Sequence, residues 1–575
     1  MMRTPWADEP NMGGLRQGAR VWIAMAILAL VLLPSAAIAW QWRAMPHLGA
    51  WHDDAVYVVS AKSLATGAGY RLLNLPGEPA QTKYPPLYPL LLSLVWRIAP
   101  AFPANLPLAM LLQWSMLPAL AALLWIWFRR VGFGIAAAVA LTTLVVLCPM
   151  TTMFATTPLT EIPFLIAILA SLLLIGEGAI TVERAVLAGL CAAAAVLIRT
   201  NGIVLAAAIP LALWRTDHST RLRRIAGFLA PVIAAFAAWE IWCALVRVPA
   251  SSDLLSYYTD YAGFYRHTFS LADLPRRLWL NLDGLLTSIG RLVAWSTSEG
   301  VAYRQLCWFL SILAIGGWIE LWRRGQRGAA WFAAFFGGVL IVWNFPPDQR
   351  FAYPLLPFAA AGIGVMGGKV VSRLPVEWAL GRVSNRIAAS VMACCITAAL
   401  LAIVCLDLHA YRDTLPSWIA EQRERSNQMR PVYVWIARET PPASTVAAYD
   451  DPLLYLYTGR HAVSVAVLPT LVYQGSDRAL AAYVRSTVRE WNAANVQYAL
   501  TTPADFRREF QETARDAEFS ELQTGWRPVF QSIGGVVWAQ REAVCAAGAA
   551  CGDAGLGFSS SLKIGASTPT SIGPR

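Results

Sequence analysis

Residues 21–40 read VWIAMAILALVLLPSAAIAW, a run of apolar and small residues without a single charge. About 20 mostly apolar residues, or ~30 Å of α-helix, are needed to cross the hydrocarbon core of a bilayer. The run is longer than the apolar core of a secretory signal peptide, and no clean cleavage site follows it. It therefore predicts a retained membrane-spanning helix.

The composition of the chain agrees with this first helix. Of the 575 residues, 57% are hydrophobic and 14% are charged, whereas soluble domains carry about 25% charged residues. This composition excludes a soluble enzyme, a disordered chain and a nucleic-acid-binding protein, in spite of the formal net charge of +11. Many of the 25 tryptophans stand near the ends of apolar runs, as in the aromatic belts of membrane interfaces.

Apolar runs along the chain predict a polytopic α-helical membrane protein with about 11 transmembrane helices. The predicted spans are 21–42, 105–128, 132–150, 160–176, 185–199, 202–214, 225–247, 303–322, 329–345, 351–368 and 387–408. One further run, 85–100, contains Pro85, Pro86, Pro89 and Arg97, and a juxtamembrane or re-entrant helix is expected there. If this run does not cross, most clusters of arginine and lysine lie on the cytoplasmic side with the N-terminus, as the positive-inside rule requires.

This topology predicts a domain organisation. It comprises a cytoplasmic N-terminus (1–20), a transmembrane domain (21–408) with exterior loops at 43–104 and 248–302, a small periplasmic α/β domain (409–545) and a disordered tail (546–575). The long loop, 248–302, is rich in tyrosine and arginine, which fits either a lid on the acceptor side or an amphipathic interfacial helix. The sequence does not decide whether Cys545 and Cys551 form a disulfide.

The α/β domain is predicted because charged residues become frequent after about residue 410 and short strands alternate with helices. The expected strands are Ser444–Tyr449, Ala462–Leu468, Gln497–Thr501 and a hairpin over Arg527–Ala539 that turns at Gly534–Gly535. The expected helices run from Asp450 or Asp451 to Tyr457, with Gly459 as the stop signal, and over Ala479–Asn492.

Acids and bases gather in the predicted exterior segments. Asp53 and Asp54 stand at the start of a predicted helix directly after the first span, and Glu161 stands at the mouth of a later span. The basic residues of these segments are Lys83, Arg199 and Arg350. Each of these residues alone fits a helix cap or an interfacial anchor. Together they place acids and bases from separate segments on one face of the membrane, as an interfacial active site requires.

The motifs in this order resemble those of bacterial GT-C glycosyltransferases, of the protein O-mannosyltransferase-like and lipid A aminoarabinose transferase-like types. The matching residues are Asp53, Asp54, Tyr57, Ala61, Leu64, Gly67, Lys83, Pro86, Tyr88, Thr160, Glu161, Arg199, Gly202, Arg350, Tyr353 and Pro357. The resemblance covers most of residues 20–540. It implies transfer of a sugar, with inversion, from a polyprenyl-phosphate donor to a hydroxyl of an envelope lipid, polysaccharide or protein at the outer face of the inner membrane.

Roles follow from this reading. Asp53, which matches the catalytic acid of the family, is the expected general base, with Asp54 and Glu161 as further catalytic candidates. Lys83, Arg199 and Arg350 are expected to hold the donor phosphate. The candidate substrate-binding residues are Tyr57, Tyr84, Tyr88, Asn201, Tyr258 and Tyr353.

No cofactor is expected, because a lipid-linked sugar is already activated and needs no nucleotide-binding loop. A divalent metal could bind hard ligands such as His52, Asp53, Asp54 and Glu161, but we do not expect an obligatory one. The expected partners are the donor, an envelope acceptor and the bilayer, without nucleic acid. The alternatives are a transporter or flippase, which predicts charges at mid-span and inverted repeats, and a non-catalytic protein of envelope assembly.

Overall fold

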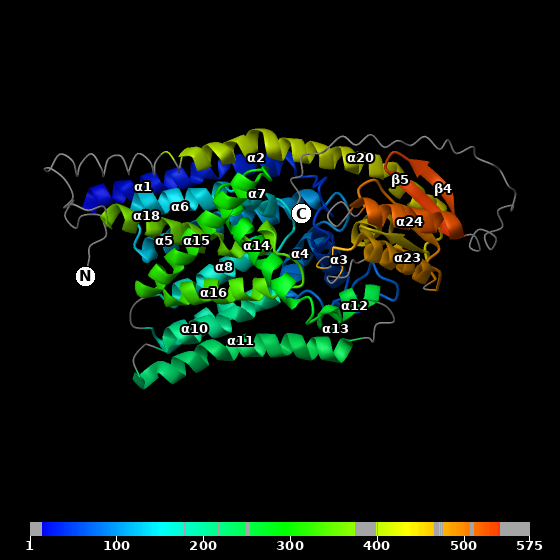
Figure 1. Ribbon diagram of the computed structural model, residues 1–575. Coiled ribbons are helices and arrows are strands. Elements are labelled where there is room, and N and C mark those ends of the chain that lie inside the picture. Colours follow the sequence, from blue (N-terminus) through cyan, green and yellow to red (C-terminus); the bar gives the residue numbers. More distant parts are fainter. Residues whose placement is uncertain are drawn as a thin grey trace.

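The computed structural model describes residues 14–176, 180–214, 218–247, 253–373, 398, 401–464, 471, 473, 475–493, 495–505 and 511–540. In this part of the chain, a bundle of helices makes up most of the molecule, and a small α/β unit packs at one end of the bundle (Figure 1). The predicted tail at 546–575, the pair Cys545 and Cys551, and most of the predicted span 387–408 lie outside the described residues.

The bundle begins with the predicted first helix. α1 (Gly14–Val31) and α2 (Leu33–Gln41) form one continuous apolar segment, Gly18–Gln41, long enough to cross a membrane. The later helices are α3 (Asp53–Ala65), α4 (Leu87–Ile98), α5 (Leu106–Val131), α6 (Ile135–Leu147), α7 (Pro149–Ala155), α8 (Glu161–Leu174), α9 (Val182–Ile198), η1 (Thr200–Val204), α10 (Leu205–Leu213), α11 (His218–Val246), α12 (Asp253–Thr259), α13 (Tyr261–Thr268), α14 (Leu274–Val293), α15 (Val301–Arg323), α16 (Arg327–Ile341), α17 (Gln349–Ala352), η2 (Tyr353–Leu355) and α18 (Leu356–Arg373).

Five helices of the described chain are long and apolar enough to cross a membrane, so the protein is a multi-pass membrane protein. They are Gly18–Gln41, Leu106–Val131, Ser219–Val246, Val301–Arg323 and Gln349–Lys369. The pair α6 and α7, bent by 62°, brings the number to six if it forms one span. The expected number of eleven stays a prediction.

Several of the remaining predicted spans are apolar helices that are shorter than expected. α8 has 14 residues and α16 has 15, which corresponds to about 21–23 Å of helix. α8 begins at Glu161, and α9 ends directly before Arg199. These helix ends place charged side chains inside the bundle. α4, in the run that we did not expect to cross, has only 12 residues.

The α/β unit contains strands where the sequence predicted them, with small shifts of their ends, although residues 465–468 of the predicted strand Ala462–Leu468 lie outside the described residues. They are β1 (Thr445–Ala448), β2 (His461–Val463), β3 (Tyr498–Thr501), β4 (Trp526–Ser532) and β5 (Gly535–Gln540). The sheet has the order β2-β1-β3-β5-β4, in which β1 runs parallel to β2 and β3, and β5 runs antiparallel to β3 and β4. The register pairs Val446 with Ala462 and with Tyr498.

Helices connect and cover these strands. They are α20 (Leu415–Glu439), α21 (Asp451–Thr458), α23 (Asp477–Ala493) and α24 (Gln511–Gly525). As predicted, α21 stops at Gly459, which adopts a left-handed conformation with φ of 70°. The hairpin turns at Gly534, where a Cβ atom would lie 2.2 Å from the backbone oxygen of Gln428 in α20. Only glycine allows this close approach.

The α/β unit and the first predicted loop are packed against each other. α3, α4, α12 and α13 lie at the end of the bundle that faces the unit (Figure 1). The Ala462 N–H in β2 donates to the carbonyl oxygen of Asn74 over 2.7 Å. A Cβ atom at Gly49 would lie 2.8 Å from Leu453 in α21. Contacts of this kind make the loop a structural part of the junction between the two units.

Membrane orientation is testable at the two ends of α5. In a background without the nine native cysteines, we expect Ala104→Cys to react with an impermeant maleimide added to intact cells. Ala136→Cys, at the first turn of α6, should react only after permeabilisation, because the positive-inside rule predicts that the end of α5 with Arg129 and Arg130 faces the cytoplasm. The reverse labelling pattern would contradict the topology and place the site residues on the wrong side.

Candidate active site

Arg350 is the residue around which the candidate site is built. Its short helix, α17, starts directly after Asp348, whose Oδ1 accepts from the backbone N–H groups of Arg350 (2.9 Å) and Phe351 (3.1 Å). This capping fixes the start of the helix. The side chain of Arg350 therefore projects from a capped helical turn.

The guanidinium of Arg350 bridges two carboxylates from distant parts of the sequence. Its Nη2 lies 2.8 Å from Oδ2 of Asp53, and its Nε lies 2.6 Å from Oε1 of Glu161. Arg199 binds the same Oε1 from Nη1 at 2.7 Å. The side chain of Glu161 is fully buried and that of Arg350 is 7% exposed. The attraction between these opposite charges therefore has to offset the free-energy cost of removing them from water. The structure thus brings together four of the predicted site residues.

Asp53 is the most accessible acid of this cluster, with a side chain that is 21% exposed. It is the first residue of α3, and its Oδ1 accepts a hydrogen bond from the Tyr84 hydroxyl. Burial alone would raise the pKa of Asp53, but the charges of Arg350 and Lys83 and the hydrogen bond from Tyr84 outweigh it and hold this pKa well below its usual range. Asp53 is therefore ionised in the free protein.

Asp54, the second acid of the pair, has a different environment. Its side chain is fully buried, and its Oδ2 accepts from the backbone N–H of Gly49 over 2.8 Å. Successive helical residues point about 100° apart, which agrees with the different partners of the two acids. Asp54 fastens the turn before α3, while Asp53 faces Arg350.

Lys83 lies beside this cluster, among aromatic rings. Its Nζ is 3.3 Å from the ring centroid of Tyr257 and 4.9 Å from that of Tyr84. The rings of Tyr258 and Tyr261 lie at 5.5 and 5.4 Å. The amine is buried and has no hydrogen-bond partner among the described residues. Burial lowers the pKa of Lys83 to about 7, although the charges of Asp53 and Asp451 oppose the shift.

The remaining predicted residues lie at different distances from this cluster. Tyr57 lies close to the cluster and packs edge-on against Tyr84 and Tyr88, with ring centroids at 5.0 and 5.3 Å. Tyr88 donates to Oε1 of Gln113 over 2.7 Å, and Tyr353 is fully buried against Phe154, so both belong to the packing of the bundle. Asn201 lies in η1 and makes no side-chain hydrogen bond to the described residues.

A second group of contacts was not predicted from the sequence. Oδ1 of the fully buried Asp451, in α21, accepts from the Tyr258 hydroxyl over 2.9 Å and lies 3.0 Å from Nε2 of His52. Oδ2 of the same residue accepts from Nδ2 of Asn74 over 2.6 Å. The sequence offered one signal, since an acidic pair follows a predicted strand at Tyr449, but we interpreted it only as a helix cap.

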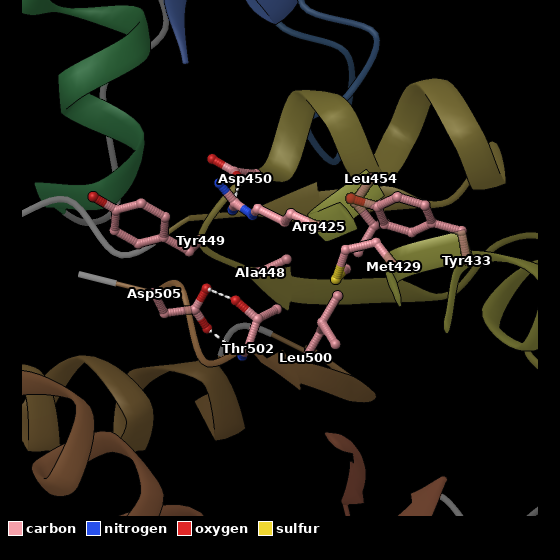
Figure 2. A pocket seen from close by; sticks show the side chains of 10 residues that line it. All are labelled: Arg425, Met429, Tyr433, Ala448, Tyr449, Asp450, Leu454, Leu500, Thr502 and Asp505. Atoms are coloured by element: carbon pink, nitrogen blue, oxygen red, sulfur yellow. Dashed lines mark hydrogen bonds and ion pairs between the residues drawn. The ribbon is translucent and has the colours of Figure 1, made fainter. Parts of the chain in front are cut away.

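The α/β unit has a polar cleft of its own at the carboxyl ends of β1 and β3 (Figure 2). It is lined by Arg425, Met429, Tyr433, Ala448, Tyr449, Asp450, Leu454, Leu500, Thr502 and Asp505. Arg425 binds Asp450 over 2.7 Å, and Asp505 accepts two bonds of 2.6 Å from Thr502. The cluster around Arg350 is the stronger candidate, because the Lys83 amine beside it is buried and has no hydrogen-bond partner among the described residues.

Among the described residues, no group of three or more histidine, cysteine, aspartate or glutamate side chains is arranged to hold a metal ion. The expectation that no metal is obligatory stays a prediction.

No protein-family model and no curated protein matches the sequence. Among solved structures, the chain is similar to the Archaeoglobus fulgidus oligosaccharyltransferase tethered with an acceptor peptide, at 12% identity and a TM-score of 0.51, over 88% of this chain and 72% of that chain. ArnT from Cupriavidus metallidurans in the apo state matches at 15% identity and a TM-score of 0.47, over 84% of this chain and 93% of that chain. The similarity to the archaeal enzyme confirms the predicted GT-C resemblance at the level of the fold.

Proposed function

We propose that the chain is a membrane glycosyltransferase that transfers a sugar from a polyprenyl-phosphate donor to a hydroxyl of an envelope acceptor, with inversion. The acceptor is a lipid, a polysaccharide or a protein, and the site faces the periplasm at the bacterial inner membrane. The fold that the chain shares with an oligosaccharyltransferase supports this class of reaction. The observation that carries the proposal is the buried guanidinium of Arg350 between the carboxylates of Asp53 and Glu161.

The donor phosphate has a ready place beside this guanidinium. Arg350 presents a planar fork that binds phosphate through two parallel hydrogen bonds. Arg199 reaches the same cluster through Glu161, and the amine of Lys83 is buried close by without a hydrogen-bond partner among the described residues. A phosphate oxygen would satisfy that amine. Binding of an anion would also favour the protonated form of Lys83, whose pKa burial lowers to about 7.

The same binding event would activate Asp53. In the free protein its low pKa makes it a weak base, because efficient general bases have a pKa near the working pH. When phosphate oxygens take the hydrogen bonds of Arg350, Asp53 loses its strongest partner and its pKa rises. The base is then available only when the donor is in place, and Glu161 keeps Arg350 and Arg199 oriented throughout.

The chemical step is a single displacement. The acceptor hydroxyl oxygen attacks the anomeric carbon from the face opposite the phosphate, and its proton passes to Asp53. The bond between the anomeric carbon and the phosphate oxygen breaks, and polyprenyl phosphate leaves with one additional negative charge. Arg350, Arg199 and Lys83 stabilise this charge as it develops, which is how such sites lower the barrier.

A donor-cleavage assay tests this function. The purified protein in lipid nanodiscs is incubated with undecaprenyl-phosphate hexoses and pentoses labelled in the sugar, together with an envelope extract as acceptor. We expect label to enter the extract and undecaprenyl phosphate to appear in equal amount. No transfer with any donor of the panel, by a protein that still binds undecaprenyl phosphate, would contradict the proposal.

The same assay tests the predicted independence of metal. The reaction needs only a carboxylate base and protein cations, so treatment with EDTA followed by gel filtration should change the rate by less than about twofold. The control is the treated protein with Mg²⁺, Mn²⁺ or Zn²⁺ added back. A loss of transfer that one of these ions restores would show that a metal takes part.

A further inference from the structure

Asp451 connects three segments that lie far apart in the sequence. It belongs to α21 of the α/β unit, and it binds His52 in the first loop, Asn74 in the same loop and Tyr258 in α12. The Tyr258 hydroxyl also lies 2.9 Å from Nε2 of His52, so these two groups share Oδ1 of Asp451, whereas Asn74 binds Oδ2. The carboxylate is fully buried. A buried carboxylate with three well-placed partners holds those partners in a fixed geometry.

His52 is held by this carboxylate in an unusual backbone conformation. It has φ of 61° and ψ of −54°, and the N–H of Asp53 donates to the carbonyl oxygen of Trp51 over 2.7 Å. This is a γ-turn of the rare, strained kind centred on His52. Strained residues persist at functional sites when the surrounding structure fixes them. The turn immediately precedes Asp53, so it sets where that carboxylate points.

We propose that Asp451 is a positioning residue for the candidate base: through His52 and Tyr258 it fixes the γ-turn that aims Asp53 at the reacting groups. The α/β unit is then part of the active site rather than an appendage of the membrane domain. This inference rests on the proposed function, and it extends that function to a residue outside the membrane domain. Displacement of a catalytic group by about 1 Å can lower the rate about 100-fold.

The first test compares two neighbouring aspartates in the donor-cleavage assay. In Asp451→Ala we expect kcat to fall roughly 100-fold, with the donor KM and the binding of undecaprenyl phosphate changed by less than about twofold. The matched control is Asp450→Ala, which removes the adjacent carboxylate, paired with Arg425 at 2.7 Å within the α/β unit. The control should keep kcat within about twofold.

A reciprocal exchange tests the geometry and guards against simple misfolding. Asp451→Asn alone leaves one acceptor oxygen for groups that bind two, so when this oxygen keeps Tyr258 the new amide N–H₂ faces Nδ2 of Asn74, which donates to Oδ2 of Asp451 in the wild type. Combining Asp451→Asn with Asn74→Asp restores an acceptor and a donor in reversed order and keeps the total charge. We expect the kcat of the double variant to be at least ten times that of the single variant Asp451→Asn. Absence of recovery in a folded double variant counts against the proposal.

Amide hydrogen exchange provides a readout that does not depend on activity. We expect faster exchange over residues 49–56 in Asp451→Ala than in the wild type and in Asp450→Ala. Unchanged exchange in this segment, or an unchanged kcat in Asp451→Ala, would overturn the inference. If exchange rises as expected but the wild type transfers no sugar from any donor, the positioning role stands and the proposed function fails.

Tyr258→Phe decides the matter if Asp451→Ala does not fold. It removes one hydrogen bond to Asp451 and keeps the ring that lies 5.5 Å from the Lys83 amine. We expect a several-fold loss of kcat with an unchanged donor KM. A wild-type kcat in this variant, together with failed recovery in the reciprocal exchange, would leave Asp451 with a role in folding alone and refute the proposal.

Discussion

An Asp53→Asn variant is expected to lose sugar transfer by roughly 10²–10⁴-fold, the usual effect of removing a general base. The amide has nearly the same shape as the carboxylate but cannot accept a proton near neutral pH. The donor should still bind, because Arg199, Arg350 and Lys83 remain. The measurement is the initial rate of label transfer from undecaprenyl-phosphate sugar, with undecaprenyl phosphate binding followed in parallel.

Asp54→Asn is the matched control for this variant. It removes the charge of the neighbouring acid, whose Oδ2 accepts from the N–H of Gly49. Because an amide oxygen can accept the same bond, we expect a smaller loss of transfer than in Asp53→Asn. Equal losses in both variants, or full activity in Asp53→Asn, would remove Asp53 from its role as base.

Arg350→Ala is expected to weaken donor binding strongly. Truncating one partner of a desolvated, hydrogen-bonded charge cluster costs about 2–5 kcal/mol, which corresponds to roughly 30- to 4,000-fold in affinity. Arg350→Lys should recover only part, because an ammonium cannot reproduce two parallel bonds to phosphate. Binding of undecaprenyl phosphate, measured by native mass spectrometry in nanodiscs, gives the affinities.

Two controls separate binding from folding in this experiment. Arg489→Ala removes an exposed arginine that makes two bonds, 2.7 and 3.2 Å, to Glu521, and it should leave donor affinity unchanged. Arg350→Ala combined with Glu161→Gln removes the buried carboxylate that Arg350 compensates, so stability should partly return while donor binding stays weak. Wild-type affinity in a folded Arg350→Ala variant would assign Arg350 to structure and leave Lys83 and Arg199 as the phosphate ligands.

The sequence alone was sufficient for features that depend on neighbours along the chain. The uncharged run at residues 21–40 identified the first membrane helix, because its hydropathy and length are local properties. The acids at the start of α3 and the stop of α21 at Gly459 follow from local preferences at helix ends. The strands near Thr445 and Tyr498 followed from apolar runs between helical segments.

The number of crossing helices was not fixed by these local properties. Hydropathy marks apolar segments but not their lengths as helices, and α8 and α16 are shorter than their apolar runs suggested. Both lie in the helical bundle whose interior holds the charged cluster. Packing between helices, rather than contact with lipid alone, decides how much of such a segment is helical and where it ends.

Only the tertiary structure decided which charged residues are partners. The sequence placed Asp53, Glu161 and Arg350 near one face of the membrane, but equally allowed each to be a cap or an anchor. Their pairing requires segments separated by 189 positions to meet inside the bundle, and that of His52 with Asp451 spans 399. A buried charge is stable only with a partner, and the sequence shows the charged residue but not which residue is its partner. The sequence therefore shows which residue types are present at each helix end, while the packing of the α/β unit against the first loop decides how these residues are placed relative to one another.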